Sequence, residues 1–507
     1  MNKIAQKFLF VLLPVGVFSL SACNNTVNKV CSLYQDGASY VTTTKGEAKA
    51  YNSVSYEIIG GDEVMPIAGF YAPYSSGGSV DGHSMPDFLT EEIFQELEDC
   101  GINTFVYGID RWNTGGENTA LKEALDLCEE HNIGYYVSAY EVMAQLGSHT
   151  TKYPVENMDM SFLESLINEI SDNGKRKGFI GLHALDEPFS HEIDNLSVLF
   201  KAFYDLDIVK ERGYDLFANA LGTWEGENNF YGYDAPLTYD EYMQKFFDEL
   251  TGIKMLSATQ YPFTSANTSE EEVSSNLYGL LAKYRKYAKD NGVSHWRMLQ
   301  AGGQWNDDQQ WIESVSPYPS EGELLFDVNT SLAFGAKGIQ YFPLIEPFYF
   351  AYEKGGTYDF DNRNGLIGAD GNLTRWYYYA KRANTEIQAI DHVLMKSSNE
   401  GVIVHGDTAK KYVVGEGNLE GAYIADGKWR ELTSVSGKDC IIGCFDYKGG
   451  TALYVVNYSR TEKSDIELNF SDNYRYEVIQ RGVSADVVGN YVPLTLDTGE
   501  GALIVLQ

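Results

Sequence analysis

The stretch GFIGLHALDEPFSHEI, residues 178–193, joins a continuous apolar run to a turn and the start of a helix. A short apolar run that is bounded by turn residues indicates a buried strand, here one that passes into a helix. The last strand positions carry two adjacent carboxylates, Asp186 and Glu187, followed by Pro188. Like charges repel, so an acidic pair at the end of an apolar strand is either an ordinary turn with a helix cap or part of a functional site.

The same alternation of strand and helix recurs from about residue 65 to residue 396. The predicted strands are 65–74, 103–110, 133–141, 178–188, 215–222, 255–263, 294–305 and 337–347. The predicted helices are 90–101, 118–132, 160–172, 191–206, 237–252, 270–290, 320–336 and 372–396. Apolar strands that alternate with helices eight times predict an α/β fold, the (β/α)8 or TIM barrel. An open doubly wound sheet is disfavoured, because no glycine-rich phosphate loop follows the first strand.

The pattern changes after residue 396, where short strands are separated by Gly, Asp and Asn turns. The candidate strands are 401–406, 422–429, 440–459, 465–470, 474–480 and 501–507. Such a series predicts a C-terminal antiparallel β-sandwich that packs against the barrel. We therefore expect a signal peptide over 1–22, a tether and N-terminal segment over 23–62, the barrel over 63–396 and the sandwich over 397–507.

The N-terminal sequence MNKIAQKFLFVLLPVGVFSLSAC has two lysines, an apolar run and then small residues. This order predicts an export signal, and its apolar run is too short for a stable membrane-spanning helix. The ending LSAC resembles the bacterial lipobox, which implies that Cys23 is lipidated and anchors the chain to a membrane. The alternative is a plain secretory signal that is cut near Ala22. By the same resemblance Asn24 implies the outer membrane, on its periplasmic or cell-surface side.

Composition excludes several kinds of partner. The formal charge is −34, which argues against nucleic acid and against a polybasic membrane surface. The cysteine spacings show no zinc pattern. His183 and His191 flank the acid pair without the spacing of metal ligands on a helix, so we expect neither a metal nor another cofactor.

The residues that follow the predicted strands are polar and aromatic. In a (β/α)8 barrel these positions form the active site. Aromatic rings stack on sugar faces, and acids and amides bond sugar hydroxyls, so the sequence predicts a carbohydrate substrate. The candidate binding residues are Asp110, Trp112, Glu141, Asn219, Trp224, Tyr261, Gln300 and Trp305.

Several segments resemble a family of known barrels. They are LDEPFS (185–190), SATQYPF (257–263), QAGGQW (300–305), SLAFGAKGIQYFPL (331–344) and RNGLIGADGNLTRWYYYAKRANTEI (363–387). Together they look like the bacterial glycoside hydrolases of the family-42 and family-5 types, over most of residues 65–395. The resemblance implies a lipid-anchored glycoside hydrolase whose general acid/base is Glu187 at the end of strand four. A carboxyl protonates a glycosidic oxygen at neutral pH only when its pKa is raised, and burial beside Asp186 would raise it.

The chain departs from those families in two places. Their retaining members read Asn-Glu on strand four and carry a nucleophilic Glu on strand seven. Here strand four reads Asp-Glu, and the predicted strand seven contains no acid. A second catalytic carboxylate could then be Glu346 on strand eight or Glu141 on strand three. The reaction could also be inverting, with the two carboxyl groups roughly 6.5–9.5 Å apart.

A third alternative is that the substrate supplies the nucleophile. In that case Asp186 orients a 2-acetamido group, Glu187 protonates the leaving oxygen, and Tyr261 holds the acetamido group. Otherwise Asp186 orients another sugar or tunes the acid. A non-catalytic glycan-binding lipoprotein stays open as well, because the fold alone does not determine function.

Overall fold

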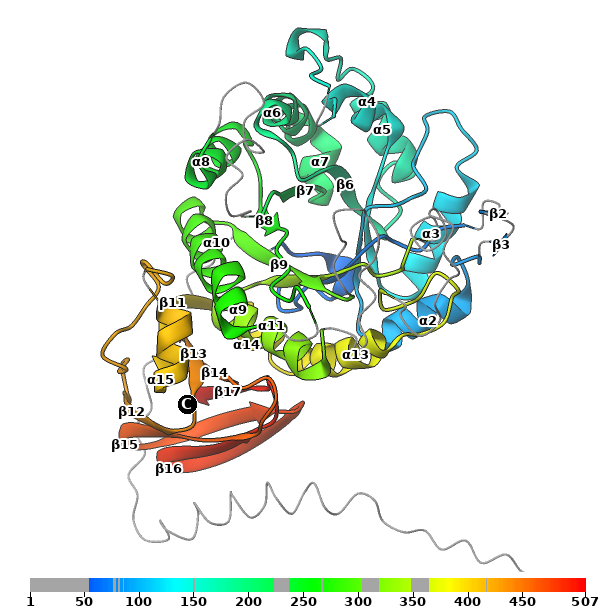
Figure 1. Ribbon diagram of the computed structural model, residues 1–507. Coiled ribbons are helices and arrows are strands. Elements are labelled where there is room, and N and C mark those ends of the chain that lie inside the picture. Colours follow the sequence, from blue (N-terminus) through cyan, green and yellow to red (C-terminus); the bar gives the residue numbers. More distant parts are fainter. Residues whose placement is uncertain are drawn as a thin grey trace, which may run out of the picture.

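The computed structural model describes residues 54–75, 79–80, 83–84, 86–148, 151–222, 237–265, 268–302, 319–347, 364–415 and 417–507. Its larger part is a closed barrel of parallel strands in the order β1-β10-β9-β8-β7-β6-β5-β4 (Figure 1). These are β1 (Ile67–Phe70), β4 (Thr104–Val106), β5 (Gly134–Val137), β6 (Phe179–Asp186), β7 (Asp215–Ala220), β8 (Met255–Ala258), β9 (Ser294–Gln300) and β10 (Gly338–Phe342). Each lies within one of the eight predicted segments, so the predicted barrel is confirmed.

Helices surround the barrel, as Figure 1 shows. They are α2 (Glu91–Asp99), α3 (Thr119–Glu130), α4 (Tyr140–Leu146), α5 (Leu163–Ile170), α6 (Ser190–Asp205), α7 (Asp207–Arg212), α8 (Tyr239–Glu249), α9 (Glu270–Asn276), α10 (Tyr278–Asn291), α11 (Glu321–Ala333), α13 (Arg375–Gln388) and α14 (Asp391–Leu394). Thr90 caps α2 as predicted, by accepting a hydrogen bond from the amide of Ile93. Helix α4 was not predicted, and the helix expected over 270–290 is broken at Leu277.

Short elements complete this part of the chain. They are η1 (Glu57–Ile59), η2 (Val155–Asn157) and the two-stranded sheet of β2 (Ser79–Val80) and β3 (His83–Ser84). No helix in the described ranges is long and apolar enough to cross a membrane.

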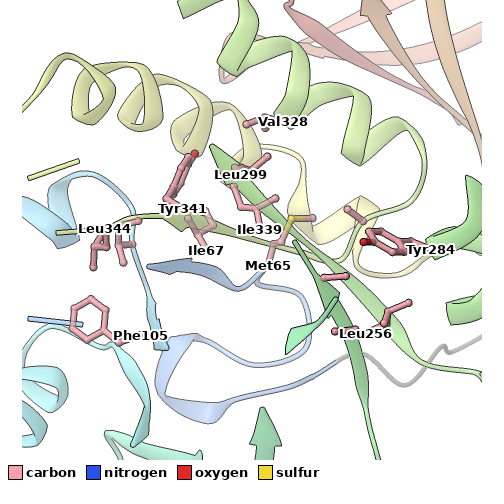
Figure 2. Close-up of a cluster of buried hydrophobic side chains, with 14 of the residues drawn as sticks. Met65, Ile67, Phe105, Leu256, Tyr284, Leu299, Val328, Ile339, Tyr341 and Leu344 are labelled. Carbon is pink, nitrogen blue, oxygen red and sulfur yellow. The ribbon is translucent and has the colours of Figure 1, made fainter. Parts of the chain in front are cut away.

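Two apolar layers make the core of the barrel. Figure 2 shows part of the outer layer, a buried cluster that includes Ile67, Leu299 and Ile339 of the strands, Tyr284 of α10 and Val328 of α11. Successive strand residues point to opposite faces, so alternate positions fill the barrel interior. The interior cluster contains Ala68, Phe70, Val106, Tyr136, Ile180, Phe217, Met255, Trp296 and Met298, together with Val54, Tyr56 and Ile59 of the preceding segment. A packed interior leaves the loops after the strands as the place for a site.

The C-terminal part is an antiparallel β-domain, as predicted. Its strands are β11 (Ser397–His405), β12 (Leu432–Gly437), β13 (Cys440–Tyr447), β14 (Gly450–Asn457), β15 (Ser464–Gln480), β16 (Val483–Leu496) and β17 (Gly501–Leu506). They form one curled sheet in the order β11-β13-β14-β17-β15-β12, with β16 beside β15. The strands predicted at 465–470 and 474–480 are one strand, β15, whose register with β16 shifts between Asn469 and Tyr474. Strands β12 and β16 were not predicted, and 422–429 is mostly turn.

Helix α11 joins the two parts of the chain. The Tyr454 hydroxyl of β14 donates to Oδ1 of Asn329 at 2.6 Å, and Nδ2 of Asn329 donates to the carbonyl of Gly499 at 2.8 Å. Gly443 of β13 lies so close to the helix that a Cβ there would stand 2.2 Å from the carbonyl oxygen of Ala333. Only glycine permits this approach, so the sheet and the barrel are packed as one unit.

We predict that Tyr454→Phe lowers the free energy of unfolding by about 1–3 kcal/mol, because it leaves the buried Oδ1 of Asn329 without a donor. Tyr378→Phe is the matched control, since Tyr378 is 61% exposed. Chemical denaturation followed by both tryptophan fluorescence and circular dichroism measures the change. Equal stability of the two variants, or separate transitions for the two domains, would contradict the interface described above.

Candidate active site

The end of β6 has an irregular backbone that turns both acids of the pair toward neighbouring strands. The register between β6 and β7 shifts between His183 and Leu185, which is a β-bulge. Glu187 has φ 50°, a left-handed conformation that is uncommon for a residue with a side chain. Its amide donates to the carbonyl of Asn219 at 2.7 Å. The bulge thus brings both Asp186 and Glu187 to the barrel mouth, where both side chains are partly exposed.

The amide of Asn219 on β7 holds the pair in place. Nδ2 of Asn219 donates to Oδ1 of Asp186 at 3.0 Å and to the Thr259 hydroxyl at 2.7 Å. Oδ1 of Asn219 accepts from the Ser257 hydroxyl at 2.7 Å, and that hydroxyl accepts from Nε2 of Gln340 at 2.5 Å. Because Nδ2 faces two acceptors and Oδ1 faces a donor, the side-chain amide of Asn219 has only one orientation. The interior network thus runs from β10 through β8 and β7 to the acid pair.

The pKa of each carboxyl group of the pair is raised above its ordinary value. Burial raises the pKa of Asp186, the charge of Glu187 raises it further, and the hydrogen bond from Asn219 lowers it. Burial also raises the pKa of Glu187, against a hydrogen bond with Thr259 that lowers it. Two carboxylates this close do not both ionise readily. The pair therefore keeps a proton at a pH where isolated carboxyls would have lost theirs.

Aromatic side chains lie beside the pair at the mouth. The Tyr71 ring lies 5.3 Å from that of Tyr107 and 5.6 Å from that of Phe342, and Phe342 stacks on Tyr261 at 5.7 Å. The charges of Glu187 and Asp186 raise the pKa of Tyr261, after burial as the main cause, so its hydroxyl lies near both acids. Tyr261 was predicted at the site, whereas Tyr107 and Phe342 were not named. Tyr107 directly follows β4 and Phe342 ends β10, whereas both lie inside the longer predicted segments 103–110 and 337–347.

His183 lies beneath the mouth. It is buried against the rings of Tyr107, Phe217 and Phe70. Burial first, and then the charge of Arg111, lower its pKa to about 3, so the imidazole is neutral. Across the described residues, no three His, Cys, Asp or Glu side chains come together as metal ligands would.

Two predicted binding acids hold the loops at the rim. Asp110 accepts from the amide of Ser75 at 2.9 Å and from its hydroxyl at 3.3 Å. Glu141 lies in the first turn of α4 and not at a strand end, and it accepts from the amide of Thr114 at 2.6 Å. Both carboxylates stabilise backbone turns after β1 and β4.

The side chains of two further candidate binding residues are engaged within the protein. Nε2 of Gln300 donates to the carbonyls of Phe263 and Gly302, at 2.8 Å and 3.0 Å. Trp112 is fully buried, and its indole donates to Glu169 at 3.2 Å. In this structure the Trp112 ring packs in the core and presents no face on which a sugar could stack, which corrects that expectation.

Glu346 lies after β10, four strands away from β6 and so on the opposite side of the barrel. It is buried, its amide donates to the carbonyl of Ile367 at 2.9 Å, and Nδ2 of Asn364 donates to its Oε1 at 3.4 Å. The candidates Trp224 and Trp305, like Cys23, lie outside the described residues.

Comparison with known proteins gives the chain structural neighbours but no family. No protein-family model matches it, and no curated protein matches its sequence. Solved glycoside hydrolases are similar in structure. The chain is 12% identical to a β-galactosidase from the psychrophilic Marinomonas ef1, with a TM-score of 0.44, over 67% of this chain and 63% of that one.

Two others cover more of the chain. The GH51 arabinofuranosidase from Xanthomonas axonopodis pv. citri is 10% identical with a TM-score of 0.43, over 90% of this chain and 97% of that one. A GH27 β-L-arabinopyranosidase from Geobacillus stearothermophilus is 10% identical with a TM-score of 0.43, over 91% and 99%. At these values the likeness concerns the fold alone.

We predict that Asp186→Asn raises the free energy of unfolding at pH 7 and that the gain disappears toward pH 4. A group whose folded pKa is raised loses stability as pH rises from its unfolded pKa, about 3.9 for Asp, through its folded pKa. The neutral amide removes this loss while its oxygen still accepts from Asn219. Denaturant unfolding between pH 4 and pH 8 measures the effect.

Asp159→Asn is the matched control, with the opposite sign. Hydrogen bonds from Ser161 lower the pKa of the exposed Asp159, so its carboxylate stabilises the fold above its unfolded pKa. A variant Asp186→Asn that is less stable than the unmutated protein at pH 7 would show that the pair is not held protonated.

Proposed function

We propose that the protein is a glycoside hydrolase that cleaves O-glycosidic bonds, with Glu187 as its general acid/base. One observation carries the proposal: two adjacent carboxyl groups with raised pKa values stand partly exposed at the C-terminal mouth of the barrel. A glycosidic oxygen leaves readily only when it is protonated, and a carboxyl with a raised pKa is the group that can do so near neutral pH. The aromatic side chains beside the pair suit the apolar faces of a sugar ring.

Glu187 would give its proton to the leaving oxygen as the bond to the anomeric carbon breaks. Its carboxylate would then take a proton from water, and the remaining hydroxyl would complete the product at the anomeric carbon. Over the whole reaction Glu187 is regenerated and one water is consumed. Asn219 keeps Asp186 oriented throughout, because its side-chain amide has only one orientation in the network.

A substrate-assisted reaction on a 2-acetamido sugar is the mechanism that the geometry favours for the attacking group. Asp186 is next to Glu187, is fixed by Asn219, and lies close enough to Tyr261 that its charge raises the pKa of that hydroxyl. Asp186 would orient the acetamido group so that its oxygen attacks the anomeric carbon, which needs no protein nucleophile. Gln300, the last residue of β9, already donates to two backbone carbonyls, so its side chain does not orient the acetamido group in this mechanism.

Glu346 supports the other mechanism, in which it serves as second carboxylate. Its position across the barrel from β6 suits a pair that leaves room for water, as in an inverting reaction with a separation of roughly 6.5–9.5 Å. The two mechanisms differ in which acid is indispensable and in whether the sugar must carry an acetamido group.

We predict that Glu187→Gln lowers kcat by about 10²- to 10⁴-fold on substrates with a poor leaving group, because general acid catalysis is lost. Aryl glycosides whose leaving group needs no proton should lose much less. The measurement is product release from a panel of aryl glycosides and oligosaccharides, with and without a 2-acetamido group. Glu164→Gln on the outer face of α5 is the control and should retain full activity.

The same panel separates the mechanisms. Activity confined to acetamido sugars and lost in Asp186→Asn supports substrate assistance, whereas activity on plain hexosides that is lost in Glu346→Gln supports the second carboxylate. Glycan binding without any turnover by the unmutated protein would instead identify a glycan-binding lipoprotein and overturn the enzymatic proposal.

We also propose that Cys23 is lipidated and anchors the exported protein to a membrane. Cys31, the next cysteine along the chain, provides the control. The expected result is that Cys23→Ser abolishes incorporation of labelled palmitate in a Gram-negative host and moves the protein from the membrane to the soluble fraction. Cys31→Ser should change neither. Lipid-free unmutated protein, cut near Ala22, would show a plain secretory signal instead.

A further inference from the structure

Arg111 stands at the same end of the barrel as the acid pair. It follows β4, and its guanidinium is partly buried: Nη2 donates to the Tyr107 hydroxyl at 3.2 Å, and Cζ lies 5.7 Å from the centroid of the Tyr140 ring. Tyr140 is 53% exposed, which is unusual for so large an aromatic side chain. We call Tyr107, Arg111 and Tyr140 the Arg111 subsite.

The backbone makes this arrangement rigid. The amide of Trp112 donates to the carbonyl of Ser138 at 2.8 Å, and the amide of Tyr140 donates to the carbonyl of Trp112 at 3.0 Å. The loops after β4 and β5 thus continue the parallel pairing of the strands beyond the barrel, with an isolated bridge between Trp112 and Ala139. These backbone hydrogen bonds therefore fix the positions of Arg111 and Tyr140 relative to each other.

Among the described residues, the guanidinium has no counter-charge. No carboxylate of the described residues lies within 4.0 Å of Arg111, although the chain has 72 acidic residues and a net charge of −34. Other partly buried arginines have one: examples are Arg176 with Asp126 and Arg460 with Glu270. Nε of Arg111 is buried and lacks a hydrogen-bond partner among the described residues.

The acids that adjoin Arg111 and Tyr140 in the sequence form hydrogen bonds elsewhere. Asp110 bonds the amide and hydroxyl of Ser75, and Glu141 bonds the amide of Thr114. A partly buried charge without a partner is costly, so a structure that keeps the neighbouring acids away from it leaves a place for an external anion. The planar fork of the guanidinium matches a carboxylate, which it can bind through two parallel hydrogen bonds.

We propose that the Arg111 subsite binds the carboxylate of a hexuronic acid residue, so that the substrate is a uronic-acid-containing glycan. This inference rests on the proposed glycoside hydrolysis and names its substrate class. Tyr140 supplies an exposed ring for the sugar face, Arg111 binds the carboxylate, and the Tyr107 hydroxyl fixes the guanidinium. Strands β4 and β6 are separated by β5, so the uronate occupies a subsite about 10 Å along the mouth from the acid pair.

The test compares hexuronate oligosaccharides with their carboxyl-reduced, neutral counterparts. Binding to the full chain carrying Glu187→Gln, which prevents turnover, is measured by calorimetry for a panel of oligogalacturonide, glucuronoxylan and hyaluronan fragments. We expect at least one uronate probe to bind about 10- to 100-fold more tightly than its reduced form, the range of a charge-assisted bidentate contact.

Adding Arg111→Gln should abolish this discrimination while leaving the affinity for the reduced form unchanged. Arg111→Lys keeps the charge but loses the fork, and should retain only part of the discrimination. Arg475→Gln, which removes an exposed arginine of the C-terminal domain, is the matched control and should retain all of it.

The inference is overturned if no uronate probe binds more tightly than its reduced form, or if Arg111→Gln weakens both forms equally. Preferential binding of a sulfate-ester glycan, tested with a carrageenan fragment, would also overturn the carboxylate assignment. The proposed hydrolysis is judged separately, by product release from the protein with an intact Glu187. Cleavage of neutral glycosides at least as fast as of their uronate counterparts would overturn the uronate inference alone.

Discussion

The hydrogen bond from Nδ2 of Asn219 to Asp186 is the interaction on which the site depends. Its geometry is fixed from inside the barrel, because the Ser257 hydroxyl donates to Oδ1 of the same Asn219 side chain and itself accepts from Gln340. The carbonyl of Asn219 meanwhile accepts the amide of Glu187 and so sets the main chain of the second acid. One residue of β7 thereby positions both carboxyls, and the polar network makes any other arrangement of β6 costly, since it would leave buried donors without acceptors.

Local strain accompanies this arrangement. Tyr71, Tyr107 and Glu187 all have positive φ angles, and each follows a different barrel strand. Residues held in this way cost about 1–3 kcal/mol each, and they persist because the surrounding structure determines them. The closed barrel and the C-terminal sheet that packs on α11 provide such a frame. Strained residues clustered at one end of a rigid scaffold are typical of a functional site.

The electrostatics of the mouth are local and not set by the net charge. Protonation of the acid pair follows from burial and from the proximity of the two carboxyls, whereas the overall charge is strongly negative. Among the described residues Arg111 has no carboxylate partner for a similar local reason, since Asp110 and Glu141 accept from backbone amides. A strongly acidic protein therefore carries carboxyl groups with raised pKa values and an unpaired guanidinium at the same end of the barrel.

The sequence by itself determined the barrel, the following β-domain and the place of the acid pair. Apolar periodicity and helix caps are local properties, and a strand such as 178–188 must be buried wherever it lies in the barrel. It did not determine which strand-end residues face the mouth. Trp112 is buried in the core and Gln300 donates to backbone carbonyls, while Tyr107 stands at the mouth without having been named as a candidate.

Only the tertiary structure decided these points, because a side chain's direction at a strand end depends on bulges, positive φ angles and contacts with distant strands. The pairing of β6 with β7 joins Asp186 to Asn219 across 33 positions of sequence, and the network reaches β10, which lies 83 positions beyond Ser257. Strand β15 shows the same limit. The sequence pattern predicts a turn between 465–470 and 474–480, whereas the structure has a bulge there within one continuous strand. Local pattern sets which elements form, and closure of the barrel sets which of their side chains meet.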